Sequence, residues 1–397
     1  MSDNLARGLA HSGECELFFC GAENFRMWVM AQKYLRSDPE LSRVPLLSYG
    51  SPARVYGFLG RWFWELSKEK SVALPARVFR RALADTLRAM ESGFEPLDAR
   101  ALRGAQIFHS SFYRLPDSTL EVPGLKRFLS VCDLINIQQP ALSSDGGAYL
   151  KSILSTLRRE DFAIAISHCT KDDLCDYRRD LDPDRISVVH LAASPAFHPV
   201  SEEHRLREVR KRHGLGDRPF FLSVCTLDKR KNLEGLVQAF GRWLRQEKDA
   251  HTDLVLCGSL GESATAVRNR VREEGIDENR VKVLGYVPDS DLAPLYSAAL
   301  AFVYPSFYEG FGLPVVEAMQ CGLPVVTSRG SSLQEIADGA ARLVDPADID
   351  DIAAALDEMS RSAEERRALC AAGLERARRF SWEKSTRDLL AAYRRAL

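Results

Sequence analysis

Short apolar runs alternate with amphipathic stretches along the 397-residue chain. The runs are bounded by turn residues or polar segments, which is typical of buried strands. Two series of such strands are predicted, at 15–21, 107–111, 127–135, 162–167 and 186–191, and then at 219–227, 253–258, 281–287, 300–306 and 324–328. Helical patterns such as 76–90 lie between them. Strand–helix alternation with short connections predicts parallel sheets with helices on both faces.

Two such series predict an α/β fold of two doubly wound domains that face each other across a cleft. The Pro-containing stretch 192–204 precedes a strongly polar helix and indicates the join. We place the domains at 1–197 and 198–379. The last segment, 380–397, is expected to pack back toward the first domain as a helix.

The N-terminal end departs from the doubly wound pattern, which normally opens with a central strand. Residues 1–14 instead predict a helix, because Leu5 and Leu9 recur at helical spacing and Gly13 suits its end. The run 15–21 would then be the second strand, and the first strand is missing. We therefore hypothesise that the true start lies upstream of Met1, or that the chain is a naturally shortened form.

Composition limits the classes of partner and compartment. The chain has 54 basic and 55 acidic residues and a net charge of -1, so bulk attraction to nucleic acid is not expected. Nine scattered cysteines without a C-x-x-C pair favour a reducing, cytoplasmic setting. The first residues lack an apolar signal-peptide core, and no run reaches the roughly 18 apolar residues of a membrane span.

The pentapeptide Gly-Leu-Pro-Val-Val occurs twice, at 312–316 and 322–326. In the first copy Pro314 suits the first turn of a helix, which the following residues continue. Gly322 suits the C-terminal cap of that helix and opens the second copy, which leads into the strand 324–328. One copy therefore opens a helix, and the other leads into a strand.

The first copy follows a strand and a Gly-x-Gly turn, so it places a helix N-terminus at the carboxyl end of a strand. Free backbone N–H groups and the helix dipole at such a position favour a phosphate. Glu309 in the turn and Glu317 in the helix can face one ligand. For Glu317 alone, an equally good interpretation is a capping or dipole partner.

These residues resemble a known family. Residues 305–328 are similar to the signature of retaining GT-B glycosyltransferases of family 4, including two glutamates separated by seven residues. The resemblance is specific over 219–397 and diffuse before that, and it is strongest toward bacterial mannosyltransferases that build surface polysaccharides. Further matching segments follow in the same order, at 223–240, 281–306, 331–346 and 380–382. The resemblance implies the GT-B fold, with two Rossmann-like domains.

The resemblance also implies roles for individual residues. Glu309 would contact the transferred sugar and help to stabilise the reacting centre, and Lys231 with Arg230 would bind the donor diphosphate. A Lys–Arg pair with helix N–H groups can stabilise the charge that grows on a leaving diphosphate without a metal. Both Glu309 and Lys231 are expected in polar loops; for residues 228–232 a solvated loop is the alternative. The other donor-binding positions are Glu317, which would hold the ribose, and Gly258, Val287, Gly310, Phe311, Gly312 and Leu313.

The chain departs from the family where relatives often carry a His-Asp pair at a strand end. Cys132 and Asp133 stand there, and a thiol is too weak a donor to replace an imidazole. His109 is our first candidate for the missing catalytic group, and His168 is the second. A lone histidine at either place is more often merely packed.

Three Asp-x-Asp triplets lie in polar turns or at helix starts, at 180–182, 289–291 and 348–350. Aspartate is common at such positions as a capping residue. We interpret all three as structural and expect neither a metal requirement nor a cofactor.

The favoured function is that of a retaining glycosyltransferase, which moves a sugar from a nucleotide donor to a glycan or lipid-linked acceptor. The first candidate for the donor is GDP-mannose, which would supply mannose. A nucleotide-sugar hydrolase or epimerase of the same fold is one alternative. A degenerate, non-catalytic partner that binds nucleotide sugar is another.

The segments 53–70 and 76–90 mix aromatic and basic residues. This mixture predicts either peripheral contact with an anionic membrane or a buried aromatic face beneath a solvated basic one.

Overall fold

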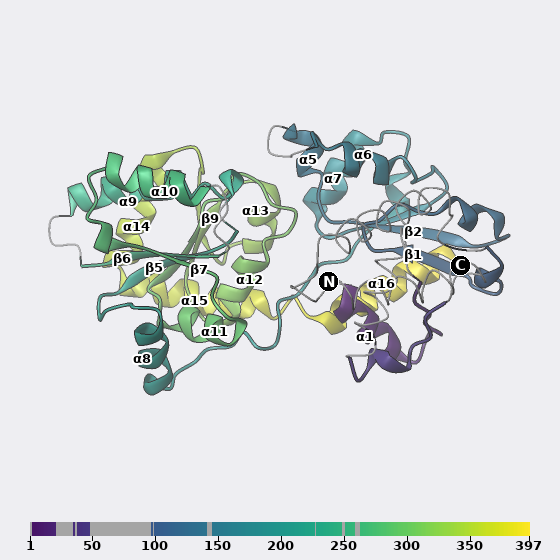
Figure 1. The fold of residues 1–397 in the computed structure, drawn as a ribbon, viewed down its shortest axis with the longest axis horizontal. Coiled ribbons are helices and arrows are strands. Elements are labelled where there is room, and N and C mark those ends of the chain that lie inside the picture. Colours follow the sequence, from purple (N-terminus) through teal and green to yellow (C-terminus); the bar gives the residue numbers. More distant parts are fainter. Residues whose placement is uncertain are drawn as a thin grey trace, which may run out of the picture.

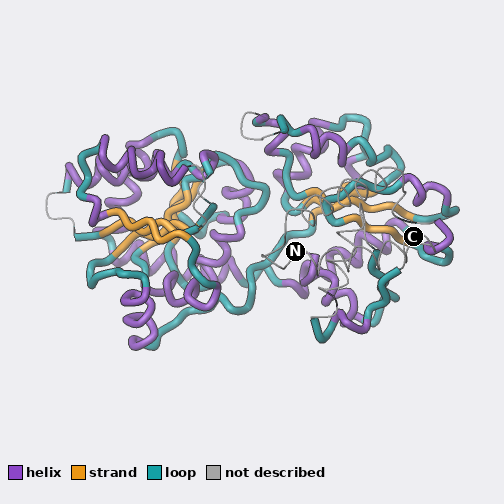
Figure 2. Tube along the Cα trace, viewed as in Figure 1, coloured by secondary structure: helices purple, strands orange, loops and turns teal. Residues whose placement is uncertain are grey.

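Two parallel sheets, one in each half of the chain, organise the structure into two lobes (Figures 1 and 2). The computed structural model describes residues 2–20, 35, 38–47, 97, 99–140, 145–226, 228–247, 251–258 and 263–397. The segments 53–70 and 76–90, with their predicted helix and membrane contact, lie outside the described residues.

The N-terminal lobe contains a four-stranded parallel sheet in the order β1-β2-β3-β4. Four of the five strands predicted in this half are confirmed, although β2 is shorter than the predicted strand 127–135. It ends at Val131, and the side chain of Asp133 then accepts a hydrogen bond from the backbone N–H of Ile135 at 3.1 Å, at the start of helix α5. The bounds are β1 Ile107–Ser110, β2 Lys126–Val131, β3 Phe162–Ala165 and β4 Ile186–Val188.

The N-terminal end begins with the predicted helix, α1 (Ser2–Ser12), and Gly13 follows it in the left-handed conformation. The strand predicted at 15–21 is wrong. Within residues 15–20 the only pairing is an isolated bridge from Phe19 to Leu46. Leu17 and Phe19 instead pack onto a small cluster built by Ala6, Leu35 and Leu41. Residues 15–20 are therefore not the second strand of the four-stranded sheet.

The C-terminal lobe contains a six-stranded parallel sheet in the order β10-β9-β8-β5-β6-β7. All five strands predicted in this half are confirmed, and the short β10 was not predicted. The bounds are β5 Phe220–Val224, β6 Asp253–Cys257, β7 Val281–Gly285, β8 Ala301–Tyr304, β9 Val325–Ser328 and β10 Arg342–Val344.

Helices cover both faces of the C-terminal sheet. Helices α9, α10 and α14 pack together on one side, and α11, α12 and α15 lie on the other (Figure 1). Within the described residues, the helices after α1 are α5 Ile135–Gln138, α6 Ala148–Leu154, α7 His168–Tyr177, α8 Glu203–Arg212, α9 Leu233–Gln246, α10 Ser263–Glu273, α11 Asp289–Ala298, α12 Leu313–Gln320, α13 Ser331–Ala337, α14 Ile349–Arg361, α15 Ala363–Ala377 and α16 Trp382–Ala396.

The two copies of Gly-Leu-Pro-Val-Val have the two predicted structures. In the first copy Gly312 has φ 101° and α12 begins at Leu313. Helix α12 ends at Gln320, Gly322 has φ 70°, and β9 then begins at Val325. Both glycines occupy the left-handed region, where a side chain would be strained.

Helix α16 leaves the C-terminal lobe and lies beside α1 in the N-terminal lobe (Figure 1). Leu389 and Tyr393 are buried there in one cluster with Leu5, Leu9 and Phe128. The end of the chain therefore completes the core of the half in which the chain began. The exact domain boundaries stay predictions. Among the described helices, none combines the length and apolar character that crossing a bilayer demands.

Candidate active site

Three charged residues meet at the carboxyl edge of the C-terminal sheet. Arg230 and Lys231 follow β5 in a short 3-10 helix, Lys229–Lys231, and Glu309 follows β8. Strands β5 and β8 are neighbours in the sheet, although two strands, β6 and β7, and their helices lie between them in sequence. The strand order reverses between them, and ligands of open α/β sheets bind at such reversal points.

The carboxylate of Glu309 is held by cations and hydroxyls together. Lys231 Nζ lies 2.7 Å from Oε1, and Arg230 Nη1 lies 2.7 Å from Oε2. The hydroxyl groups of Tyr304 and Ser306 donate to Oε1 at 2.9 and 2.7 Å. We call Arg230, Lys231 and Glu309 the charged triad.

Lys231 and Glu309 of the charged triad are buried and Arg230 is half-buried, which counts against the alternative of a solvated loop at 228–232. Only 9% of Lys231 and 7% of Glu309 is exposed. Burial alone would raise the pKa of Glu309, but the charges of Lys231 and Arg230 outweigh it and hold that pKa below its ordinary value. Two cations therefore face the carboxylate of Glu309, and Arg230 also lies 3.8 Å from the carboxylate of Asp228.

The Gly-x-Gly turn adds backbone donors beside the charged triad. Within the part of the chain that the structure describes, no group accepts a hydrogen bond from the backbone N–H of Phe311, Gly312 or Leu313. These groups begin α12, where the positive end of the helix dipole lies. The turn can therefore offer several N–H groups to an anion.

Glu317 lies further along α12 and does not cap that helix. Its carboxylate accepts a hydrogen bond from the hydroxyl of Tyr296 at 3.1 Å, and the residue that precedes the helix is Gly312. Burial raises the pKa of Glu317 to about 7; the bond from Tyr296 opposes this shift, and the charge of Asp289 adds to it. A carboxyl with this pKa changes its charge near neutral pH.

Gly258 and Val287 follow β6 and β7 at the same edge of the sheet. Gly258 has φ 140°, and a Cβ atom on it would lie 1.6 Å from the carbonyl oxygen of Cys225. Its N–H donates to the carbonyl of Gly285 at 2.8 Å. The close approach of the Cys225 carbonyl and the positive φ therefore require a glycine at 258. Donor binding by Gly258 and Val287 stays a prediction.

The turn that carries Glu309 is also the place where the lobes touch. The carbonyl of Gly310 accepts a hydrogen bond from Ser167 Oγ at 2.7 Å, just before α7. A Cβ atom on Gly310 would lie 2.2 Å from the carbonyl oxygen of Cys132. The hydroxyl of Tyr308 donates to Asp173 of α7 at 2.5 Å. The N-terminal lobe therefore supports the turn directly.

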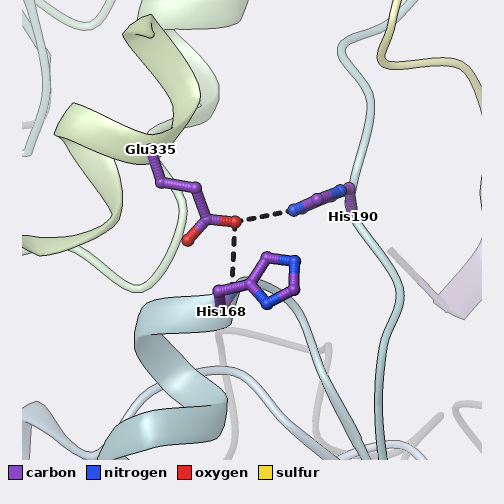
Figure 3. A group of neighbouring side chains, drawn as sticks. All are labelled: His168, His190 and Glu335. Atoms are coloured by element: carbon purple, nitrogen blue, oxygen red, sulfur yellow. Dashed lines mark hydrogen bonds and ion pairs between the residues drawn. The ribbon is translucent and has the colours of Figure 1, made fainter.

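A second contact between the lobes is centred on Glu335 of α13 (Figure 3). Its carboxylate lies 2.7 Å from His190 Nε2 and accepts hydrogen bonds from the backbone N–H of His168 and Cys169 at 3.0 and 3.1 Å. Neither Glu335 nor His190 was singled out from the sequence. His168, the second candidate for the missing histidine, therefore lies at this contact.

His109 does not belong to the charged triad. Its ring nitrogens lie 2.9 Å from Ser130 Oγ and 2.5 Å from the hydroxyl of Tyr393 in α16. Burial lowers the pKa of His109 to about 4, so the ring is neutral at physiological pH. The catalytic assignment of His109 is not supported, because both nitrogens are used where β1, β2 and α16 pack together.

Asp133 of the N-terminal lobe interacts electrostatically with the charged triad. Burial raises the pKa of Asp133, and the charges of Arg230, Glu309 and Lys231 all act on its carboxyl. The neighbouring thiol of Cys132 stays protonated, because burial raises its pKa to about 11.

Two of the Asp-x-Asp triplets carry a helix-capping aspartate, as predicted, whereas the printed ion pairs of the triplet 289–291 reach residues far away in sequence. Asp182 and Asp348 accept hydrogen bonds from backbone N–H groups at the starts of the helices that follow them. Asp291 forms ion pairs with Arg212 and His213 at 2.5 and 2.9 Å.

Some partners of Glu309 were missed from the sequence. Tyr304 and Ser306 stand two residues apart in extended chain, so both side chains point to the side on which Glu309 lies. That spacing was available as a signal. Ser332 gave no such signal: its hydroxyl donates to the carbonyl of Glu309 at 2.7 Å from a distant helix.

Comparison with known proteins identifies the fold. The structure is similar to that of sucrose-phosphate synthase from Thermosynechococcus elongatus, with a TM-score of 0.64 at 20% identity over 99% of this chain and 92% of that one. The two parallel sheets and their helices are those of the GT-B glycosyltransferase fold.

Residues 207–376 match the family described as glycosyl transferases group 1. Two curated relatives from Escherichia coli are similar. O-antigen chain mannosyltransferase B is 41% identical over 53% of this chain and 55% of that protein. Serotype-specific mannosyltransferase WbdA is 28% identical over 62% of this chain and 30% of that protein. The match thus spans about half, or less, of the length of these relatives.

Proposed function

We propose that the chain is a retaining glycosyltransferase that moves mannose from GDP-mannose to a glycan or lipid-linked acceptor in surface polysaccharide synthesis. The observation that carries the proposal is the charged triad, buried at the strand-order reversal of a glycosyl transferases group 1 domain. The names of the two curated relatives support mannose and the polysaccharide product.

In the proposed reaction the bond between the anomeric carbon of the sugar and the diphosphate oxygen breaks. Its electron pair stays on that oxygen, so negative charge grows on the diphosphate. Lys231, Arg230 and the N–H groups at the start of α12 stabilise this charge, because they are already oriented before the bond breaks. The acceptor hydroxyl forms the new bond to the anomeric carbon, and its proton passes to the departing diphosphate oxygen.

Glu309 has two tasks in this scheme. Its carboxylate orients Lys231 and Arg230, to which it is bound at 2.7 Å. It also contacts the transferred sugar, where positive charge develops as the leaving group departs. The diphosphate charge is met by protein cations alone, so we propose that transfer needs no metal and no cofactor.

A donor panel tests the proposal against its two rivals. The purified chain is incubated in EDTA with GDP-mannose and other nucleotide sugars, with and without a mannose-containing acceptor. Sugar on the acceptor is the expected result. Free sugar alone would indicate a hydrolase, and binding without turnover would indicate a non-catalytic partner.

Donor affinity should weaken as the pH falls through about 7, the pKa to which burial raises Glu317. The carboxylate accepts bonds from both ribose hydroxyls, whereas the protonated acid loses part of this capacity. If only the ionised form binds, the Kd for GDP-mannose should rise by about tenfold between pH 8 and pH 6. Both phosphates of a nucleotide sugar stay ionised over this range.

Glu317→Gln is the matched control for this titration. The amide has the size of the acid and cannot ionise, so the variant should bind donor more weakly at pH 8 and with little change down to pH 6. An unchanged tenfold slope in the variant would assign the titration to another group and remove the role of Glu317.

A further inference from the structure

Three side chains that bind metals well come together between the two lobes. His168 begins α7, His190 follows β4, and Glu335 lies on α13 (Figure 3). One ligand atom from each side chain lies within 4.8 Å of the ligand atoms of the other two. We call these three residues the interdomain cluster.

We propose that the interdomain cluster binds a divalent transition-metal ion, of which Zn²⁺ is the best fit. Two imidazoles and one carboxylate are a ligand set that zinc takes in proteins, with a water in the fourth position. Two ligands of a tetrahedral zinc ion stand about 3.3 Å apart when each bond is about 2.0 Å long. The ligand atoms lie within 4.8 Å of one another, which is wider than this spacing, and the exposed ring of His168 can turn inward to close the difference.

The other contacts of the cluster prepare it for an ion. The carboxylate of Glu335 is fixed by the backbone N–H groups of His168 and Cys169, and ordered ligands of this kind are typical of metal sites. The centroid of the His190 ring lies 6.1 Å from the centroid of the Phe311 ring and 5.7 Å from that of the Phe380 ring. Apolar rings beside a ligand limit access of water to the ion.

The ion would connect the lobes. His168 and His190 belong to the N-terminal half and Glu335 to the C-terminal half, so a shared ion holds α7 against α13. The pair formed by His190 and Glu335 at 2.7 Å already joins the lobes without it. The ion would replace the direct contact of that pair and add His168 as a third ligand. This inference does not depend on the proposed transfer reaction.

Zinc binding is measured on the whole metal-free chain, in competition with a chromophoric chelator. One equivalent of Zn²⁺ should bind with a Kd of about 10 µM or tighter. Thermal unfolding should shift upward by about 3 °C or more in excess zinc, because the ion binds only the folded form.

His168→Ala is the decisive variant, because its side chain is exposed and the pair of His190 with Glu335 stays intact. It should weaken zinc binding by at least about tenfold and abolish the thermal shift. His213→Ala is the matched control: His213 also contacts a carboxylate, Asp291 at 2.9 Å, and its loss should leave the affinity for zinc unchanged. No binding below about 100 µM, or equal binding by wild type and His168→Ala, would overturn the proposal and leave an ion pair between the lobes.

Discussion

Glu309→Gln should lower the rate of sugar transfer at saturating donor by at least about 100-fold, because one preorganised charged group at a reacting centre commonly contributes that much. Glutamine has the size of glutamate and keeps one oxygen for Lys231 and the hydroxyl of Ser306. It removes the negative charge that faces the transferred sugar and that orients the two cations. The rate is measured with GDP-mannose and acceptor in the presence of EDTA.

Glutamine is a better replacement than alanine here because the charged triad is buried. Alanine would leave Lys231 and Arg230 without any side-chain acceptor at this position, and removing one partner of a buried pair costs about 3–5 kcal/mol of folding free energy. Glu375→Gln is the control, since the side chain of Glu375 is 66% exposed on α15. Transfer within a few-fold of wild type by folded Glu309→Gln would remove Glu309 from the reacting centre.

Gly310→Ala should also lower transfer by about 100-fold, which is a common effect of a displacement of about 1 Å at a reacting centre. The new Cβ atom would lie 2.2 Å from the carbonyl oxygen of Cys132 and 2.8 Å from Cβ of Asp133. The first of these atoms belongs to the backbone, so the lobes must move apart or the turn must shift. Either movement displaces the adjacent Glu309.

The unfolding temperature separates this effect from a loss of fold. Gly310 is not in the left-handed region, so alanine strains only the contact between the lobes, and the C-terminal lobe should stay folded. Gly216→Ala is the matched control, because a Cβ there meets no atom within 4 Å and its φ is also ordinary. A normal transfer rate in Gly310→Ala would show that the contact between the lobes does not position the turn.

Much of the fold could be predicted from local pattern alone. The strands of the C-terminal sheet are short apolar runs between helical segments, and buried parallel strands take this form. Gly312, Pro314 and Gly322 set the two structures of the repeated pentapeptide, since each acts through its own backbone. The prediction of a strand at 15–21 was wrong because the apolar side chains of Leu17 and Phe19 pack on a small cluster beside α1, away from the four-stranded sheet.

The candidate site was only partly predictable. Glu309, Lys231 and Arg230 could be found because they belong to a contiguous motif and a basic loop. Their burial could not, since it depends on β5 and β8 becoming neighbours. The place of His109 was decided by Tyr393 of α16, which is 284 residues away in sequence. Contacts of this kind, like that of Glu335 with His190, leave no local pattern.

The most direct test of the charged triad compares the nucleoside diphosphate with the monophosphate of the donor that the panel selects. Calorimetric titration in EDTA at pH 8 gives the two affinities for wild type and for Lys231→Met. We predict that wild type binds the diphosphate at least about tenfold more tightly than the monophosphate, and that Lys231→Met loses most of this preference. Equal affinity of wild type for the two nucleotides would contradict diphosphate recognition by Arg230 and Lys231, and with it the proposed role of the triad.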